Sequence, residues 1–258
     1  MLKFVTCGEY KEKRMNKGLK RLITVLIALV IVVAVFFLTV FLLAKQKKIF
    51  INEWFVDEKT SVIGVDVSSY QAEINMDKLK EQDIEFIYIK ATEGSTFQDA
   101  RFAENWENAA RAELLSGAYH FFSYDSEGRT QAENYIGTVG TGLRGRLLPA
   151  VIVDYYGDKE KNPPEKEDVV RELRICLEIL EEEYGVKPLI YTRSDINEKY
   201  LKGEFDEYKK WISSIYTPLS WNYKDDWYIW HYLNRGKLEG YTGGETYIDL
   251  DVLNKEKK

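Results

Sequence analysis

Hydrophobic residues fall into three patterns along the chain, and each predicts a different kind of segment. The first is an unbroken apolar run from Leu22 to Ala44, in which Thr24 and Thr39 are the only polar residues. At ~1.5 Å per helical residue this run reaches ~34 Å, more than the ~30 Å core of a bilayer. It is too long for the ~7–15-residue core of a signal peptide, and no small-residue cleavage site follows it. Residues 22–44 are therefore predicted to form a transmembrane helix.

The second pattern starts at Val62 and consists of short runs rich in Val, Ile and Tyr. Such runs, with little polarity on either side, are typical of strands covered on both faces. Eight strands are expected, at Val62–Val67, Glu85–Ala91, Leu115–Phe122, Ala150–Asp154, Pro188–Thr192, Lys210–Ser213, Trp227–Tyr232 and Tyr247–Leu250.

The third pattern, apolar residues at helical spacing, lies between the strands. It predicts helices over Asp99–Glu113, Thr130–Val139 and Lys166–Tyr184. Strand–helix alternation is typical of a parallel sheet built from βαβ units. Eight strands between residues 62 and 258 therefore predict an α/β fold, an irregular TIM-like (β/α) barrel with some helices short or missing.

Charge divides the chain into two unlike parts. Residues 1–61 hold eleven basic and five acidic side chains, a balance of +6, whereas residues 62–258 carry −12. Seven basic residues precede the apolar run and three follow it closely, so the positive-inside rule places the N-terminus in the cytoplasm. We expect a single-pass protein of the cytoplasmic membrane. Its parts are a basic cytoplasmic tail (1–21), a transmembrane helix in membrane lipid (22–44), a polar stalk (45–61) and an extracellular barrel domain (62–258).

Composition excludes several functional classes. With 45% hydrophobic and 30% charged residues the chain is not wholly disordered. The acidic main domain argues against a nucleic-acid partner, which needs clustered Lys and Arg. Cys7 and Cys176 are predicted on opposite sides of the membrane and cannot pair within one chain. His120 and His231 lack metal-ligand spacing and are expected to be neutral and hydrogen-bonded, so no metal and no cofactor are predicted.

Polar side chains recur where the predicted strands end, which is where a (β/α) barrel holds its chemistry. The candidate catalytic residues are Asp66, Asp154 and Asp249, at the ends of the first, fourth and eighth strands. Candidate substrate-binding residues are Lys90, Glu93, Tyr119, His120, Tyr156, Tyr191 and Trp230. Any one of these alone is equally typical of a turn, a cap or the barrel core. Together, carboxylates rimmed by aromatic rings favour glycan cleavage, because two carboxylates flank a glycosidic bond and flat rings suit sugars.

Six stretches resemble glycoside hydrolase family 25, the Chalaropsis-type lysozymes (N-acetylmuramidases). These are Gly64–Gln71 (GVDVSSYQ), Phe86–Gly94 (FIYIKATEG), Gly117–Phe122 (GAYHFF), Pro188–Thr192 (PLIYT), Trp230–Tyr232 (WHY) and Tyr247–Leu250 (YIDL). They occur in family order over about residues 62–254. The resemblance implies an irregular (β/α) barrel and peptidoglycan strands as the substrate, cut at the β-1,4 bond between N-acetylmuramic acid and N-acetylglucosamine. It also implies active-site aspartates at Asp66 and Asp249, with Lys90 and His120 lining the groove.

The fourth strand departs from the family pattern. The family carries Asp-x-Glu there, with the Glu as general acid. Aligned without a gap from Pro149, this chain has Ile152 at the first acid and Asp154 at the second, whereas a shifted alignment puts Asp154 first and Tyr156 second. The gapless alignment makes Asp154 the proton donor and Asp66 or Asp249 the second carboxylate. Because Asp is one methylene shorter than Glu, its carboxyl retreats by ~1–1.5 Å, and a misplacement of ~1 Å can cost ~100-fold in rate.

Three functions stay open on the sequence. The first is a membrane-anchored peptidoglycan hydrolase of impaired activity, which would open the wall for an assembly or secretion apparatus and so meet cell-envelope or secretion proteins. The second is a non-catalytic peptidoglycan-binding ectodomain, favoured by Ile152 and Asp154. The third is a structural ectodomain with no glycan function.

Overall fold

A computed structural model describes residues 16–46, 49–56, 61–142, 147–221, 223 and 227–254 of the chain. Two compact units are present, Met1–Phe50 and Ile51–Lys258. The first contains helix α1, Lys17–Lys45, whose N-terminus is capped by the Asn16 side chain accepting from the Gly18 N–H at 3.1 Å. Among the described residues α1 is the one helix long and apolar enough to cross a membrane, with a mean hydropathy of 3.4. It contains the predicted span 22–44.

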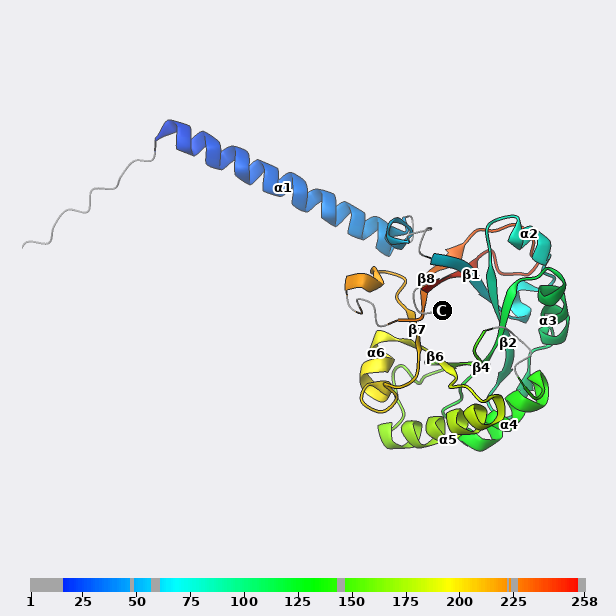
Figure 1. Ribbon diagram of the computed structural model, residues 1–258. Helices are drawn as coiled ribbons and strands as arrows, with labels where there is room; N and C mark the ends of the chain where they lie inside the picture. The colour runs from blue at the N-terminus through cyan, green and yellow to red at the C-terminus, as the bar shows by residue number, and fades with distance from the viewer. Residues whose placement is uncertain are drawn as a thin grey trace, which may run out of the picture. The chain divides into compact units, whose positions relative to one another are not determined.

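The second unit is built on a closed barrel of eight strands (Figure 1). The strands are β1 (Ser61–Val67), β2 (Phe86–Glu93), β4 (Leu115–Phe121), β5 (Ala150–Val153), β6 (Leu189–Arg193), β7 (Lys210–Ser213), β8 (Ile229–Gly236) and β9 (Ile248–Asn254). Their order is β1-β9-β8-β7-β6-β5-β4-β2, and pairing of β1 with β2 closes the ring. The short β3 (Phe97–Gln98) is added to β2 as an antiparallel flap. All eight predicted strands are present, and the (β/α) barrel is confirmed.

One strand runs against the predicted direction. β1, β2 and β4–β8 are parallel, but β9 is antiparallel to both of its neighbours, β1 and β8. The carboxyl ends of the parallel strands therefore lie beside the beginning of β9. Asp249 is the second residue of β9 and pairs with Asp66 near the end of β1. The prediction that Asp249 ends a strand is wrong, but the reversed direction brings it to the same end of the barrel.

Helices surround the strands on the outside, as Figure 1 shows. They are α2 (Met76–Lys80), α3 (Phe102–Arg111), α4 (Gly128–Val139), α5 (Lys166–Tyr184) and α6 (Ser194–Ile196), which continues as a π-helical turn, Asn197–Leu201. α5 has the predicted bounds, and its buried face includes Val169, Leu173 and Leu177. Between β7 and β8 the described residues contain only a 3-10 turn, Leu219–Trp221. Some helices are thus short or missing, as predicted.

Part of the segment predicted as a stalk packs against the barrel. Residues Ile51–Phe55 form a 3-10 turn, and the Asn52 side chain is buried. Its amide donates to the carbonyls of Ser214 at 2.6 Å and Tyr232 at 3.0 Å. This turn therefore lies against the outside of β8, next to the β7–β8 connection, whose described residues contain a 3-10 turn in place of a full helix.

Alternate residues of the strands fill the barrel interior. The inward set includes Phe86, Tyr88, Tyr119, Ile152, Leu189, Trp211, Ile229 and Leu253, all buried in one cluster. The rings of Phe86 and Tyr88 lie over the backbone of two glycines. A Cβ added at Gly64 would come within 2.3 Å of the Phe86 ring, and one at Gly117 within 2.4 Å of the Tyr88 ring.

Gly64→Ala should destabilise the barrel by about 1–3 kcal/mol, because the new methyl group displaces a fully buried ring in a packed core. Gly137→Ala is the matched control. Gly137 lies in α4 with no atom within 4 Å of its Cβ position, so alanine there should stabilise by about 0.5–1 kcal/mol. Urea unfolding of the two variants measures both changes. Equal stability of Gly64→Ala and the native chain would contradict this packing.

Candidate active site

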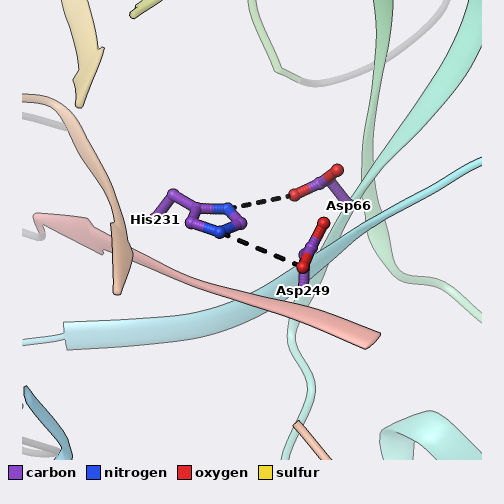
Figure 2. A group of neighbouring side chains, drawn as sticks. All are labelled: Asp66, His231 and Asp249. Atoms are coloured by element: carbon purple, nitrogen blue, oxygen red, sulfur yellow. Dashed lines mark ion pairs between the residues drawn. The ribbon is translucent and has the colours of Figure 1, made fainter. Parts of the chain in front are cut away.

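Two of the predicted catalytic carboxylates meet around a histidine at the carboxyl ends of the parallel strands. Asp66 comes from β1, His231 from β8 and Asp249 from the beginning of β9 (Figure 2). His231 Nδ1 lies 3.4 Å from Asp66 Oδ2, and His231 Nε2 lies 4.0 Å from Asp249 Oδ1. The imidazole thus stands between two carboxylates, with one ring nitrogen directed at each.

A third carboxylate, Asp251, lies next to His231 and was not among the predicted site residues. It is fully buried, its Oδ1 is 3.5 Å from His231 Nδ1, and it accepts a hydrogen bond from the Trp211 indole at 2.8 Å. Asp251 follows Asp249 by two residues in β9, so both point into the barrel. The alternation of Asp-Leu-Asp was the signal in the sequence that could have identified Asp251.

Burial and the mutual charges of these side chains shift the pKa values of Asp66, Asp249 and His231. Burial, reinforced by Asp251, raises the pKa of Asp66 to about 6, although His231 opposes the shift. Burial and the Asp66 charge raise the pKa of Asp249 to about 7. Burial alone would discharge His231, but the surrounding carboxylates hold its pKa well above its ordinary value. The carboxylates around the ring therefore favour a protonated imidazole over the expected neutral one, and Asp249, with a pKa of about 7, is close to half-protonated at neutral pH.

Asp154 stands directly after β5, and its carboxylate meets different partners. It accepts the Tyr155 N–H at 2.7 Å and lies 3.5 Å from the Arg193 guanidinium at the end of β6. Burial raises the pKa of Asp154, and the Arg193 charge works against that rise. A carboxyl with a raised pKa at a strand end is suited to donate a proton.

Tyr191 links the two acidic regions. Its side chain is on the inward face of β6, in register with Ile152 of β5 and Trp211 of β7. Its ring meets the His231 ring edge to face at 5.9 Å. Burial raises the pKa of Tyr191, and the charges of both Asp154 and Asp66 add to the rise. Asp154 directly follows β5 and Asp66 lies near the end of the parallel strand β1, so the three predicted catalytic carboxylates lie at the same end of the barrel.

Three further predicted residues lie at this end. Tyr119 is on the inward face of β4, and after burial it is the charges of Asp66 and Asp249 that most raise its pKa. Lys90 and Glu93, near the end of β2, form an ion pair of 2.6 Å. The Lys90 ammonium also lies 5.2 Å from the centre of the Phe97 ring. A charged pair beside aromatic faces suits the hydroxyls and rings of a sugar.

Two predicted substrate-binding residues point away from the site. His120 is fully buried behind β4, where Nδ1 pairs with the Thr92 hydroxyl at 2.7 Å and Nε2 with Gln131 of α4 at 3.1 Å. Trp230 lies on the outside of β8 and donates its indole N–H to the Ser214 carbonyl at 3.0 Å. Both predictions are wrong, because each residue is next in sequence to one that faces inward, Tyr119 or His231.

Tyr156 has a structural task that the sequence did not indicate. Its hydroxyl donates to Asp125 at 2.9 Å and accepts the Tyr124 N–H at 2.9 Å, which joins the segment after β5 to the segment after β4. Its ring meets Phe121, 6.1 Å away, edge to face. A role of Tyr156 in binding stays a prediction.

Asp66, His231 and Asp249 are also the described residues best placed to hold a metal ion, since one ligand atom of each lies within 4.8 Å of the others. A protonated imidazole has no lone pair for a metal, so the raised pKa of His231 opposes ligation at neutral pH. The absence of a metal stays a prediction.

Comparisons with known proteins agree with this geometry. A family model described as "Glycosyl hydrolases family 25" matches residues 65–241. The chain is 30% identical over 199 residues to the uncharacterized protein YegX of Escherichia coli K12, covering 75% of this chain and 70% of that protein. It is 38% identical over 108 residues to lysozyme M1 of Streptomyces globisporus, covering 41% of this chain and 35% of that protein. A family 25 glycosyl hydrolase structure from Bacillus anthracis matches with a TM-score of 0.72 and 43% identity, over 78% of this chain and 94% of that one.

Proposed function

The chain belongs to glycosyl hydrolase family 25, and on that premise we propose that it is a membrane-anchored N-acetylmuramidase. Its substrate is peptidoglycan, and the bond it cuts is the β-1,4 link between N-acetylmuramic acid and N-acetylglucosamine. One observation supports this most: Asp66 of β1 and Asp249 of β9 meet around His231, and Asp154 directly follows β5 at the same end of the barrel. Convergent carboxylates at this end are what glycosidic cleavage requires.

Each carboxylate takes the role that its surroundings favour. Asp154, with a raised pKa, donates a proton to the leaving oxygen as the glycosidic bond breaks. Asp66, whose pKa is about 6, is ionised at neutral pH and faces the positive charge that develops on the sugar. Asp249, the more exposed of the pair, assists at the anomeric carbon or its acetamido group. His231 holds Asp66 and Asp249 in place from behind.

Helix α1 supplies the anchor. Its length and apolarity suit a membrane span, and the excess of basic residues before residue 22 favours a cytoplasmic N-terminus. The barrel then lies outside the cytoplasmic membrane, on the side where peptidoglycan is found.

A second function, glycan binding without cleavage, is favoured by Ile152. Its side chain faces inward in register with Tyr191 and Phe121, and it is 7% exposed. In the gapless alignment this is the position of the first family acid, so an apolar group stands where the family has a carboxylate.

Insoluble cell walls incubated with the full chain in nanodiscs separate these functions. The hydrolase releases new reducing ends. Co-sedimentation with walls but no new ends indicates the binder, and neither result indicates a structural ectodomain. The hydrolase proposal is overturned by either of the last two outcomes.

Arg193→Gln should move the alkaline limb of the pH–activity profile to higher pH. The guanidinium charge lowers the pKa of Asp154, so without it Asp154 keeps its proton, and stays an active donor, to a higher pH. Arg193→Lys, which keeps the charge, should leave the limb near its native position. Arg171→Gln is the remote control, since Arg171 is exposed on α5 and pairs with Asp168. An unmoved limb in Arg193→Gln would argue that Asp154 is not the donor.

A further inference from the structure

Exposed aromatic side chains of the barrel unit gather in two segments that are far apart in sequence. Among the described residues of this unit, six large apolar side chains are exposed: Trp54, Phe55, Tyr70, Phe97, Tyr216 and Trp221. Four of the six come from the Ile51–Phe55 turn or from the connection between β7 and β8. Trp54 is 71% exposed and Trp221 65% exposed, so neither serves the barrel core.

The two segments form one surface. The Phe55 and Trp221 rings meet edge to face, with centres 5.9 Å apart. The turn that carries Trp54 and Phe55 is fixed to the barrel by Asn52, whose amide bonds to the carbonyls of Ser214 and Tyr232. Trp54, Phe55 and Trp221 are called the aromatic patch below.

The bonds of Asn52 place this patch close to the level of the active site. Ser213, which precedes Ser214, is in register with His231 across β7 and β8, and Tyr232 directly follows His231. Side chains alternate along β8, so His231 points into the barrel while Tyr232 points outward toward the turn. The aromatic patch therefore lies outside the barrel wall whose inner face carries His231.

The link between α1 and the turn that carries the patch is short. Five residues, 46–50, separate Lys45 from Ile51. A chain extends by at most ~3.3–3.6 Å per residue, so this link spans no more than roughly 22 Å. Tryptophan and other aromatic side chains are enriched at the interface between membrane and water, because their apolar faces and polar edges suit that layer.

We propose that the aromatic patch contacts the outer lipid leaflet and seats the barrel with its catalytic end close to the membrane. This inference rests on the proposed anchoring by α1. It assigns the enzyme glycan strands that lie next to the membrane, rather than strands deeper in the wall. The two hydrogen bonds of Asn52 to the barrel would hold this orientation.

Tryptophan quenching by brominated lipid tests the contact in the full chain. All six tryptophans lie in the barrel unit, since α1 contains none. In nanodiscs holding one copy each, lipid brominated near the top of its acyl chains should quench emission relative to plain lipid. The double variant Trp54→Phe, Trp221→Phe should lose that quenching. Both positions are exposed enough to accept phenylalanine without loss of folding. Near-ultraviolet circular dichroism verifies that the double variant is folded.

Trp106→Phe is the matched control. Trp106 lies in α3, which packs on β2 and β4, across the barrel from β7 and β8. This variant should keep the native quenching. Quenching that survives in the double variant, or no quenching in a chain that is in the disc, overturns the patch contact and leaves the anchor intact. Failure of the chain to enter discs overturns the anchor itself. Emission that responds to soluble glycan fragments and not to brominated lipid would make the patch a glycan surface, which also overturns the proposal.

Discussion

Asp249→Asn should lower the rate of glycan cleavage by about two to four orders of magnitude, the range associated with a positioned acid or base. Asparagine keeps the shape of the side chain but can neither carry the charge nor exchange the proton. Asp249 is 40% exposed in its side chain, against 12% for Asp66, so it is the member of the pair that a sugar reaches and whose loss least disturbs the fold. New reducing ends from cell walls measure the rate.

Two controls separate lost chemistry from lost folding or binding. Asp168→Asn removes an exposed carboxylate that pairs with Arg171 on α5, outside the barrel, and should leave the rate unchanged. Asp249→Asn should still sediment with walls. A native rate in a folded Asp249→Asn chain would remove Asp249 from the mechanism.

The double variant Ile152→Asp, Asp154→Glu should raise the rate by about 100-fold, because it returns a carboxyl misplaced by ~1 Å to its working position and adds the missing acid. Ile152 faces inward two residues before Asp154, so both side chains extend toward the same end of the barrel. The gain is measured as reducing ends released at equal enzyme concentration.

Ile152→Asn with Asp154→Glu is the matched control. It places a polar group of similar size at the buried position but no carboxylate, and it should gain only the part of the rate that depends on the longer side chain at 154. Unfolding midpoints show whether each variant tolerates a polar residue at position 152. A folded double variant with no gain would contradict the gapless alignment and the donor role of Asp154.

The strands were predictable because runs of Val, Ile and Tyr covered on both faces differ clearly from their surroundings. α5 was predictable to the residue, since its apolar positions recur at helical spacing and Gly185, in a left-handed conformation, ends it. The direction of β9 was not predictable. Its residues suit a parallel or an antiparallel strand equally well, and only the pairing with β1 and β8 decides.

Burial of both strand faces, which made the strands easy to predict, limited the prediction of the site. Where both faces of a strand are buried, adjacent residues look alike, and the sequence does not say which of them faces inward. Tyr119 and His120 were both plausible groove residues, and the structure directs the first inward and the second toward α4. The pairing of His231 with Asp66, Asp249 and Asp251 depends on strand register across the closing edge of the barrel, which local pattern does not encode.

The identity of the sugar at each new end shows which glycosidic bond the protein cuts. Peptidoglycan is digested with the full chain in nanodiscs, the products are reduced with borohydride, and the reduced sugars are separated by mass. We expect reduced N-acetylmuramic acid at every new end, and at least about 100-fold less of it from Asp249→Asn at the same exposure. Reduced N-acetylglucosamine, or no new ends from a folded chain, would contradict this expectation.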